Sequence, residues 1–538
     1  MDARIIIYHG IKIKSFSLGL TLCIFLFLHV GCAVKPPSLQ KGLEAANKGD
    51  FTTALKEWKP LAEQGYATAQ YNLGLMYTEG NAVSKNDETA LKWYKLAAEQ
   101  GYDDAQLKLG VIYANGRGVE RDDKTAIQWY KLAAEQGNVL AIYNLGIVYS
   151  TGQGVERNAK HGFNLFKLAA DQGYADAQYN LGVLYEKGDG VVQDYKAAIE
   201  WFTLAAKQDH AASQFNLGVM NANGQGAGQN NKAAFSWFKL AAEQGHAVAQ
   251  LNLGYIYAKG QGVLQDYKKA ISWFMQSAEL GDEDAQYNLG MMLENGIGVT
   301  QDIQASIKWY SLAAEQGNVL AQFNLGVIYA NGQGVTQNFN TAIQWYKQAA
   351  AQEYVDAQFN LGVLFNSVHA VQDFKAAIQW YMLAANQGNA NAQYNLGLMY
   401  YSSKGTKQDF KTALQLFQLA AEQGHELAHY NMGVMYEYGQ GVMKDDKAAV
   451  KWYKLAAGLG VVDAQYNLGL KYVKGEGVLQ DYIAAHMLFN VAAAQNHEYA
   501  RQSLNIVEKM LPAGQVTEAQ KLARECVTKN YKECYGLL

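Results

Sequence analysis

The chain has 538 residues, with 45 Lys and Arg against 49 Asp and Glu, so its formal net charge is −4. This balance argues against nucleic-acid binding, which needs a basic surface that neutralises many phosphates, and gives no polybasic surface for a membrane. A hydrophobic content of 49% excludes a disordered chain. The 52 glycines, 36 tyrosines and only 4 prolines indicate a repeated sequence rather than several separate domains.

Residues 1–31 have the order of an export signal. Basic residues precede an almost wholly apolar run over residues 16–30, as in a signal peptide, and this run is short for a membrane-spanning helix. Cys32 follows where a bacterial lipoprotein is cut and lipidated, although His29 occupies the place usually held by leucine. We expect lipidation at Cys32 in preference to cleavage nearby, for example after Ala33, and an uncleaved anchor is the remaining alternative. Residues 32–38 would form a short tether.

From residue 39 to residue 505 the sequence is repetitive. The tetrapeptide Tyr-Asn-Leu-Gly and its close variants recur every 36 residues, with one spacing of 35. Twelve copies at one period predict a stacked array of structural units. The glycines that close the tetrapeptide are Gly74, Gly110, Gly146, Gly182, Gly218, Gly254, Gly290, Gly326, Gly362, Gly397, Gly433 and Gly469.

One unit, residues 250–281, shows how each repeat should fold. Leu253 and Ile256 belong to a first apolar run with helical spacing. Gly260 stands where that helix would end, because glycine enters the left-handed region at little cost. Asp266 precedes a second periodic run and can cap the N–H groups of a new helix. We therefore predict an all-α fold, an α/α solenoid (superhelix) of about twelve 36-residue helix-turn-helix repeats.

The recurring glycine falls inside the first helix, where glycine costs about 1 kcal/mol relative to alanine. This cost indicates close helix packing. We expect the tryptophan that recurs in the second helix to pack beside the glycine or the neighbouring alanine pairs as part of the core, not of a cofactor site. The tryptophans are Trp93, Trp129, Trp201, Trp237, Trp273, Trp309, Trp345, Trp380 and Trp452.

The combined pattern, A-x-A-Q-Y-N-L-G-x-x-Y-x-x-G-x-G-V-x-x-D-x-x-x-A-x-x-W-[YF]-x-x-A-A-E-x-G, resembles the Sel1-like repeat, a relative of the tetratricopeptide repeat. The resemblance covers residues 39–505. It implies a solenoid whose concave inner surface binds a protein or peptide, and a role as adaptor or scaffold. Residues 366–370 and 401–405 lack the full Gly-x-Gly loop and mark the most irregular part of the array.

Residues 506–538 are expected to form a C-terminal helical cap. Residues 498–510 and 515–529 are predicted as the two final helices, and such end units cover apolar faces that a solenoid would otherwise expose. Cys526 and Cys534 lie eight residues apart in this segment. Some exported Sel1-like proteins staple helix pairs at this spacing, which implies a Cys526–Cys534 disulfide, and an oxidising compartment would favour it. Two free thiols are the alternative.

The segment from His425 to His429 matches H-E-x-x-H, in which two histidines on one helical face bind zinc and the glutamate acts as base. An ordinary repeat with two substitutions explains the match better. His425 stands where other repeats have asparagine, and His429 replaces the usual glutamine. No third ligand follows at the expected spacing, so we predict no metal, no cofactor and no catalytic residue. The Gly-x-Gly loops lack the Lys-Ser/Thr of a phosphate-binding loop, which argues against nucleotide binding.

An asparagine recurs in the first helix, although asparagine is a poor residue there. Its amide donates and accepts hydrogen bonds, so a column of asparagines can clamp an extended peptide. The alternative is an internal ladder in which each asparagine ties one repeat to the next. The predicted partner-binding residues are Asn144, Asn180, Asn216, Asn252, Asn288, Asn324, Asn360 and Asn395, with specificity from the nearby variable sites Thr78, Glu186, Asn221, Glu294, Tyr401 and Glu437.

Together these features predict an exported, non-enzymatic scaffold that binds a protein or peptide partner. Its expected location is the bacterial periplasm, with a lipid anchor in the outer membrane as its one link to a membrane. The first alternative is an enzyme, either a zinc hydrolase at His425–His429 or a β-lactam hydrolase by analogy with a few disulfide-rich Sel1-like proteins. The chain lacks their cysteine density and any activated serine motif. The second alternative is a secreted factor that acts on a host cell.

Overall fold

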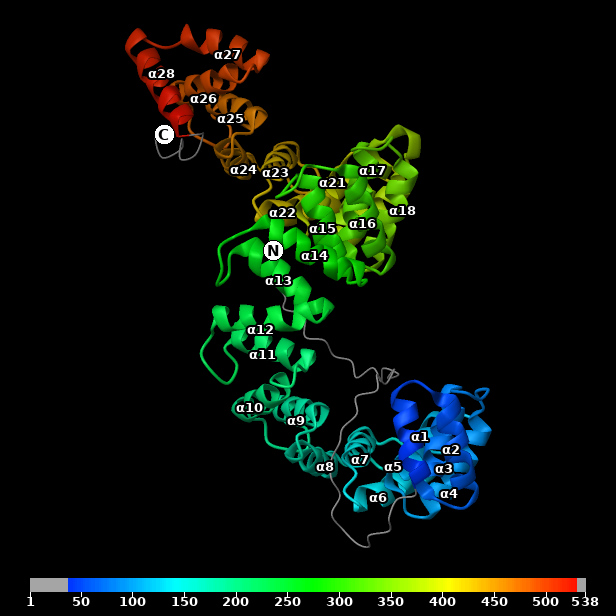
Figure 1. Cartoon of the computed structure of the whole chain (residues 1–538). Coiled ribbons are helices and arrows are strands. Elements are labelled where there is room, and N and C mark those ends of the chain that lie inside the picture. The colour runs from blue at the N-terminus through cyan, green and yellow to red at the C-terminus, as the bar shows by residue number, and fades with distance from the viewer. Residues whose placement is uncertain (1–36, 530–538) are drawn as a thin grey trace. The chain divides into compact units, whose positions relative to one another are not determined.

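The computed structural model of the protein describes residues 37–529, and the predicted export signal, Cys32 and Cys534 lie outside this range. The described residues form α-helices and one short 3-10 helix, with no strand among them (Figure 1). The predicted all-α solenoid of helix-turn-helix repeats is confirmed.

The helices are α1 (Pro37–Asn47), α2 (Phe51–Glu63), α3 (Ala67–Glu79), α4 (Asp87–Glu99), α5 (Asp103–Asn115), α6 (Asp123–Glu135), α7 (Val139–Thr151), α8 (Ala159–Asp171), α9 (Ala175–Lys187), α10 (Tyr195–Ala206), α11 (Ala211–Asn223), α12 (Asn231–Glu243), α13 (Ala247–Lys259), α14 (Tyr267–Glu279), α15 (Glu283–Asn295), α16 (Ile303–Glu315), α17 (Val319–Asn331), α18 (Phe339–Ala351), α19 (Val355–Ser367), η1 (His369–Val371), α20 (Phe374–Asn386), α21 (Ala390–Tyr401), α22 (Phe410–Glu422), α23 (Glu426–Tyr438), α24 (Asp446–Gly458), α25 (Val462–Lys474), α26 (Tyr482–Ala494), α27 (Glu498–Glu508) and α28 (Ala513–Thr528).

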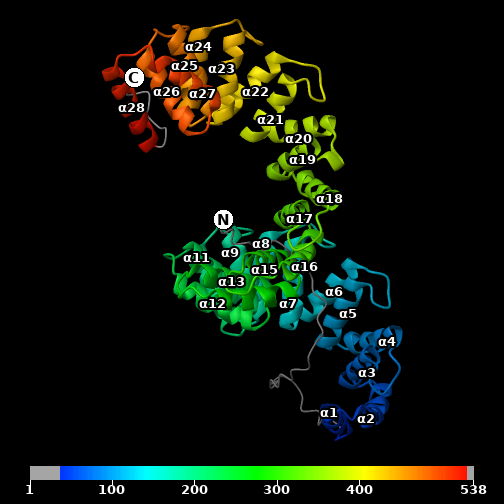
Figure 2. The same ribbon diagram turned by 90° about the horizontal axis from the view of Figure 1, so that it is seen from above.

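The chain divides into two compact units, residues 1–285 and 286–538. Within the described part of each unit the structure is a stack in which every helix contacts the next along the chain, from α1 to α14 and from α16 to α27. The paired helices can be followed in Figure 2. Because most of these contacts join helices that are consecutive in the sequence, each repeat is stabilised mainly by itself and the two repeats beside it.

The repeat containing α13 and α14 shows how the sequence sets the ends of the helices. Gly260 ends α13 in the left-handed conformation, with φ of 69°. Asp266 begins α14, and its Oδ1 accepts a hydrogen bond from the backbone N–H of Lys269 at 3.0 Å. Both predicted caps are confirmed, and together they fix the length of the loop between the two helices.

The glycine inside each first helix makes room for an aromatic ring, but the ring is not the predicted tryptophan. A side chain on Gly218 would place its Cβ 2.6 Å from Cδ1 of Phe238, the residue directly after Trp237. The same relation holds for the other repeats, where a tyrosine or phenylalanine follows the tryptophan or leucine. Of the two predicted places for the tryptophan, the glycine is therefore wrong, whereas the alanine pairs fit, since Trp273 packs against the cluster that contains Ala241 and Ala242.

The tryptophans connect neighbouring repeats. Trp273 on α14 is half-buried and packs against the apolar cluster around Phe238, which belongs to the preceding repeat. Adjacent residues on a helix point about 100° apart, because one turn takes 3.6 residues. One ring of each aromatic pair therefore fills its own repeat and the other joins it to the one before.

The array begins with an atypical helix pair. Trp58 on α2 is buried and packs against Gly42 on α1, and its Nε1 donates a hydrogen bond to the backbone oxygen of Leu39 at 3.3 Å. Trp58 thus stands in the position that holds the buried tyrosine or phenylalanine in later repeats. This explains why Trp58 is one residue out of register with the recurring tryptophans, such as Trp93. Helix α1 begins at Pro37, two residues before the predicted start of the array.

At the C-terminal end, α27 and α28 both pack on α26. The predicted boundary at residue 505 falls inside α27, and α28 begins at Ala513, right after Pro512. In the irregular region, α19 ends without a glycine and is followed by η1. Ser403 adopts the left-handed conformation (φ of 62°) in the loop after α21. These two loops are the departures that the sequence predicts.

Candidate partner-binding surface

The predicted asparagine column lies on the first helices, half-buried at most positions. At several positions the asparagine amide donates to a tyrosine hydroxyl of the preceding repeat, as Asn180 does to Tyr143. Asn252 has Phe215 at the equivalent place and donates instead to the backbone oxygen of Val248 at 2.8 Å. The amide–hydroxyl pairs, with N–O distances between 3.1 and 3.5 Å, are Asn180–Tyr143, Asn324–Tyr310, Asn360–Tyr346, Asn431–Tyr394 and Asn467–Tyr430.

The other predicted asparagines occupy the same place in their helices. Asn216 and Asn395 hydrogen-bond to Tyr179 and Tyr381, while Asn144 is half-buried and Asn288 is buried. Where an asparagine reaches a tyrosine hydroxyl, the geometry supports the internal ladder, in which the amide ties its repeat to the one before, whereas Asn252 bonds within its own helix. Binding of a partner by the same amides stays a prediction.

The pKa of the Tyr143 hydroxyl is raised to about 12, mainly by burial and also by the nearby carboxylate of Asp176, while the hydrogen bond from the Asn180 amide partly opposes them. The hydroxyl is therefore protonated at neutral pH. It can accept from the asparagine while keeping its own proton for donation.

A second ladder, built from glutamines, was not foreseen from the sequence. Gln106 is buried, and its Nε2 donates to the backbone oxygen of Ala98 in the preceding repeat at 3.1 Å. Its Oε1 accepts from Nε2 of Gln136, at the end of the second helix of its own repeat, at 2.8 Å. The same pairs, at 2.7 to 2.9 Å, are Gln70–Gln100, Gln178–Gln208, Gln214–Gln244, Gln286–Gln316, Gln322–Gln352, Gln358–Gln387, Gln393–Gln423 and Gln465–Gln495. The signal in the sequence was the pairing of two glutamines 29 or 30 residues apart.

One of the interruptions of the glutamine ladder, at Leu280, provides a test. Leu280 stands where Gln250 would meet its partner, and Oε1 of Gln250 is buried without a hydrogen bond. We expect Leu280→Gln to supply the missing donor and to raise the free energy of local opening by about 0.5–1.5 kcal/mol. Hydrogen exchange of residues 247–282 measures this. Leu280→Met, which adds no amide, is the control, and an equal gain in both variants would contradict the ladder.

A partly exposed apolar face runs along the first helices. In α17 it consists of Leu320, Phe323, Asn324 and Val327, which lie on one side of the helix because they are three or four residues apart. Leu320 is 37% exposed and the other three are half-buried. We call these positions and their counterparts in the other first helices the first-helix face. Exposed leucines recur on it at Leu140 and Leu427.

Three of the predicted variable sites are engaged within their own repeats. Thr78 Oγ1 lies 3.0 Å from the hydroxyl of Tyr94, and Glu294 accepts a hydrogen bond from the hydroxyl of Tyr310 at 2.7 Å. Glu437 accepts from Tyr453 in the same way at 2.6 Å. These side chains fix the buried ring that fills the glycine position. A role in partner specificity stays a prediction.

The two histidines of the H-E-x-x-H segment hold structural places. His425 is the N-cap of α23: its Nδ1 accepts from the N–H of Ala428, and its ring stacks on Tyr394 with centroids 4.3 Å apart. Burial lowers the pKa of His425. His429 is buried, with Nδ1 2.9 Å from the backbone oxygen of His425. Each imidazole therefore uses one nitrogen for the ordinary folding of the repeat.

Lys471 is an unexpected charge in the core. Its side chain is 3% exposed, at a position where the other repeats carry Met, Ile, Leu or Val. Its Nζ lies 2.8 Å from Glu437, 2.8 Å from Asp446 and 3.0 Å from Glu476. Burial alone would lower the pKa of Lys471, but the three carboxylates reverse this and raise it above its usual range. Hydrogen bonds from Lys471 in turn lower the pKa of Asp446 and of Glu476.

Among residues 37–529 no three His, Cys, Asp or Glu side chains group as metal ligands. Within the same range, no helix combines the length and apolarity that crossing a bilayer requires. Cys526 is buried and disulfide-bonded. Since Cys534 lies outside the described residues, the Cys526–Cys534 pairing stays a prediction, as does lipidation of Cys32.

The chain is similar to solved structures of bacterial proteins. One is a protective antigen present in uropathogenic Escherichia coli strains, described as displaying an SLR fold. It is 36% identical over 90% of this chain and 96% of that chain, with a TM-score of 0.61. Another is a Sel1 repeat protein from Oxalobacter formigenes, 31% identical over 63% of this chain and 98% of that chain, with a TM-score of 0.49. No curated protein matches the chain.

The Sel1 repeat model matches twelve times, at residues 67–102, 103–138, 139–174, 175–210, 211–246, 247–282, 283–318, 319–354, 355–389, 390–425, 427–461 and 462–497. These twelve matches coincide with the helix pairs from α3–α4 to α25–α26. Sel1 repeats form solenoids that are typical of protein-interaction scaffolds. The chain belongs to the Sel1 repeat family.

Proposed function

We propose that the protein is an exported, non-enzymatic scaffold that binds a protein or peptide partner on its first-helix face. The observation that carries the proposal is the recurrence of this face, with its aromatic and aliphatic side chains only half-buried, from one repeat to the next. An apolar surface that extends over many repeats is typical of a binding site for another macromolecule.

The composition of the first-helix face favours a protein or peptide over a small molecule. Large rings and branched aliphatic side chains contribute apolar contact area, and the asparagine amides between them can pair with a peptide backbone. The acidic net charge and the absence of a basic run in the sequence argue against nucleic acid as the partner.

Export is supported by the sequence of residues 1–31 and by the similar protein of uropathogenic Escherichia coli, which is described as a protective antigen. A location outside the cytoplasm, with Cys32 as lipid anchor, is therefore part of the proposal.

The proposal is tested with leucine variants on the two kinds of helix. At the position of Leu320 and Leu427 other repeats carry aspartate, as at Asp356, so Leu320→Asp and Leu427→Asp should fold. A partner is first captured from cell envelopes with the chain from residue 33 onward and is then purified. We expect at least tenfold weaker binding for the double variant, because a leucine buried in an interface contributes about 1.5–3 kcal/mol.

The matched control changes leucines of similar exposure on second helices. Leu312 and Leu419 are 45% and 48% exposed, and Gln348 shows that glutamine is accepted at this position in another repeat. Leu312→Gln with Leu419→Gln should leave the affinity unchanged. Equal weakening by both pairs, or no saturable partner, would refute binding on the first-helix face.

A further inference from the structure

The last Sel1 repeat has a second helix unlike the others. His486 on α26 occupies a position that is apolar in the other eleven repeats, and Met487 a position that is polar or charged there. The residues equivalent to His486 are Leu91, Ile127, Phe163, Ile199, Phe235, Ile271, Ile307, Ile343, Ile378, Leu414 and Val450.

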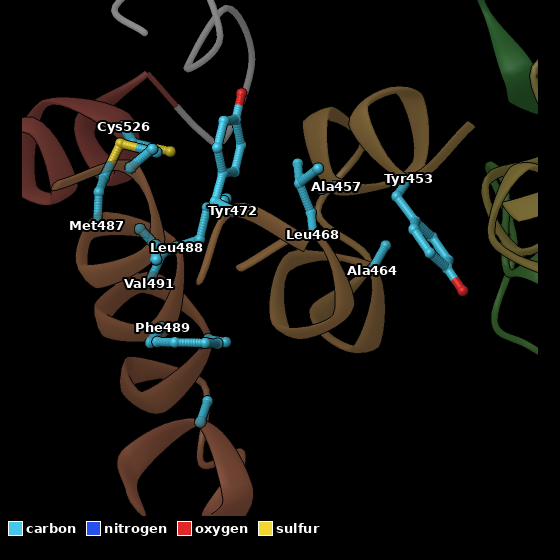
Figure 3. Packing of buried hydrophobic residues seen from close by; sticks show 14 of the residues in the cluster. Tyr453, Ala457, Ala464, Leu468, Tyr472, Met487, Leu488, Phe489, Val491 and Cys526 are labelled. Atoms are coloured by element: carbon cyan, nitrogen blue, oxygen red, sulfur yellow. The ribbon is translucent and has the colours of Figure 1, made fainter. Parts of the chain in front are cut away.

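Helix α28 covers this altered face of α26. Val491 is 1% exposed, whereas its counterpart Leu455 in the preceding repeat is 45% exposed. Met487 and Val491 of α26 and Cys526 of α28 belong to one buried cluster, which Figure 3 shows. The face of α28 turned to α26 also carries Ala519 and Ala523, both buried. Helix α28 is therefore held on α26 by apolar contacts.

His486 lies within this packing without a polar partner. Its side chain is 1% exposed, and neither Nδ1 nor Nε2 makes a hydrogen bond. A neutral imidazole in such a place already leaves one donor and one acceptor unsatisfied, and a charged imidazolium without a counter-ion is far less stable there. The packed state of the cap thus depends on a neutral ring.

The charged groups around His486 do not offset this cost. Helix α26 itself carries no acidic or basic residue other than His486. On α27, the exposed Glu508 favours the protonated ring, but burial outweighs it and lowers the pKa of His486. The other charged residues of these neighbours are Lys471 and Lys474 with Asp463 on α25, Glu498 and Arg501 on α27, and Glu518, Lys521, Arg524 and Glu525 on α28.

Several of these charged residues form ion pairs with groups other than His486. Lys471 binds three carboxylates, Asp463 lies 3.2 Å from Nε2 of His497, and Lys521 pairs with Glu525 at 3.8 Å. On α28, Glu518, Lys521 and Arg524 are exposed, as are Glu498 and Arg501 on α27. None of them is placed to compensate a charge on His486.

We propose that protonation of His486 in mild acid releases α28 from α26, so that the C-terminal cap is an acid-sensitive cover. An exposed histidine has a pKa near 6.5, and an opened cap allows His486 to approach that value. Because the open form binds the proton more tightly, the packed form loses stability as the pH falls below about 6.5. Release would expose Met487 and Val491 as an apolar surface.

Hydrogen exchange on the full chain at pH 7.5 and pH 5.5, corrected for intrinsic exchange rates, tests this proposal. One pH unit below 6.5, the opening equilibrium of α26 and α28 should rise about tenfold, while residues 247–282 serve as an internal reference. His486→Ile, which carries the residue of other repeats, should abolish the acid response and keep the cap packed.

A second histidine near the cap provides a control. His497→Asn removes the other imidazole near the cap and should leave the acid response intact. If His486→Ile does not fold, His486→Val replaces it. An unchanged opening equilibrium in the wild type between the two pH values, the same response in the His486 variant, or an NMR titration that gives His486 a pKa of 6.5 or above would overturn the proposal.

Discussion

Gly218→Ala is expected to destabilise its repeat, although alanine is the better helix former by about 1 kcal/mol. The new Cβ would lie 2.6 Å from Cδ1 of Phe238, whose ring is 1% exposed and so has no free space into which to move. Overpacking of this kind costs about 1–3 kcal/mol. We expect a net loss in the free energy of local opening, read from hydrogen exchange of residues 211–246.

Gly228 of the same repeat provides the control for this substitution. A Cβ on Gly228 would meet no atom within 4 Å, so Gly228→Ala should leave hydrogen exchange almost unchanged. The double variant Gly218→Ala with Phe238→Leu should recover part of the loss, because leucine vacates the space that the new Cβ needs. If Gly218→Ala were neutral or stabilising, the close packing of helix and ring would be refuted.

Several features of the fold follow directly from the sequence because they depend on local chemistry. The 36-residue spacing, Gly260 at a helix end and Asp266 at a helix start each report the conformation of a few neighbouring residues. Such signals are readable without knowing what packs against them. The helix-turn-helix repeat could therefore be predicted with its helix ends.

Contacts between helices were less accessible to prediction. Trp237 and Phe238 are adjacent aromatics, and the pattern does not reveal which one points to its own repeat and which to the neighbour. Gln250 and Leu280 show the same limit, because the partner of a ladder residue lies 30 positions away on a different helix. The asparagine column was found, but the choice between binding and ladder needed the position of the preceding tyrosine.

Lys471 is a charged residue at a position that is apolar in all the other repeats, and the reason lies in its surroundings. The sequence alone does not explain a lysine at a core position, because the carboxylates that surround it come together only in the folded chain. Glu437 on α23 and Asp446 on α24 both belong to the preceding repeat, whereas Glu476 follows Lys471 by five residues. The ionic cluster therefore fastens the last two Sel1 repeats to each other.

Lys471→Met is expected to lower the free energy of local opening of residues 427–497 by about 3–5 kcal/mol at pH 7, because it removes one partner of a buried ionic cluster. Methionine itself fits the position, as Met435 shows in the preceding repeat. The loss therefore arises from the carboxylates that lose Lys471, of which Asp446 keeps a second ion pair with Lys444 at 3.5 Å. Lys474→Met, which changes an exposed lysine of the same helix, is the control and should have little effect.

The loss of stability in Lys471→Met should depend on pH, whereas the loss from a simple packing defect should not. Hydrogen bonds from Lys471 hold the pKa of Asp446 and of Glu476 below their usual values, so the stability they contribute is present above pH 4–5 and is lost as the pH falls through the lowered values. The wild type should weaken in acid more than Lys471→Met, and the two should converge. The double variant Lys471→Met with Glu437→Thr should regain part of the loss at pH 7, since Thr78 meets the ring of Tyr94 as Glu437 meets that of Tyr453. A difference between wild type and Lys471→Met that stays constant from pH 7 to pH 3 would show that packing, not charge, is the role of this lysine.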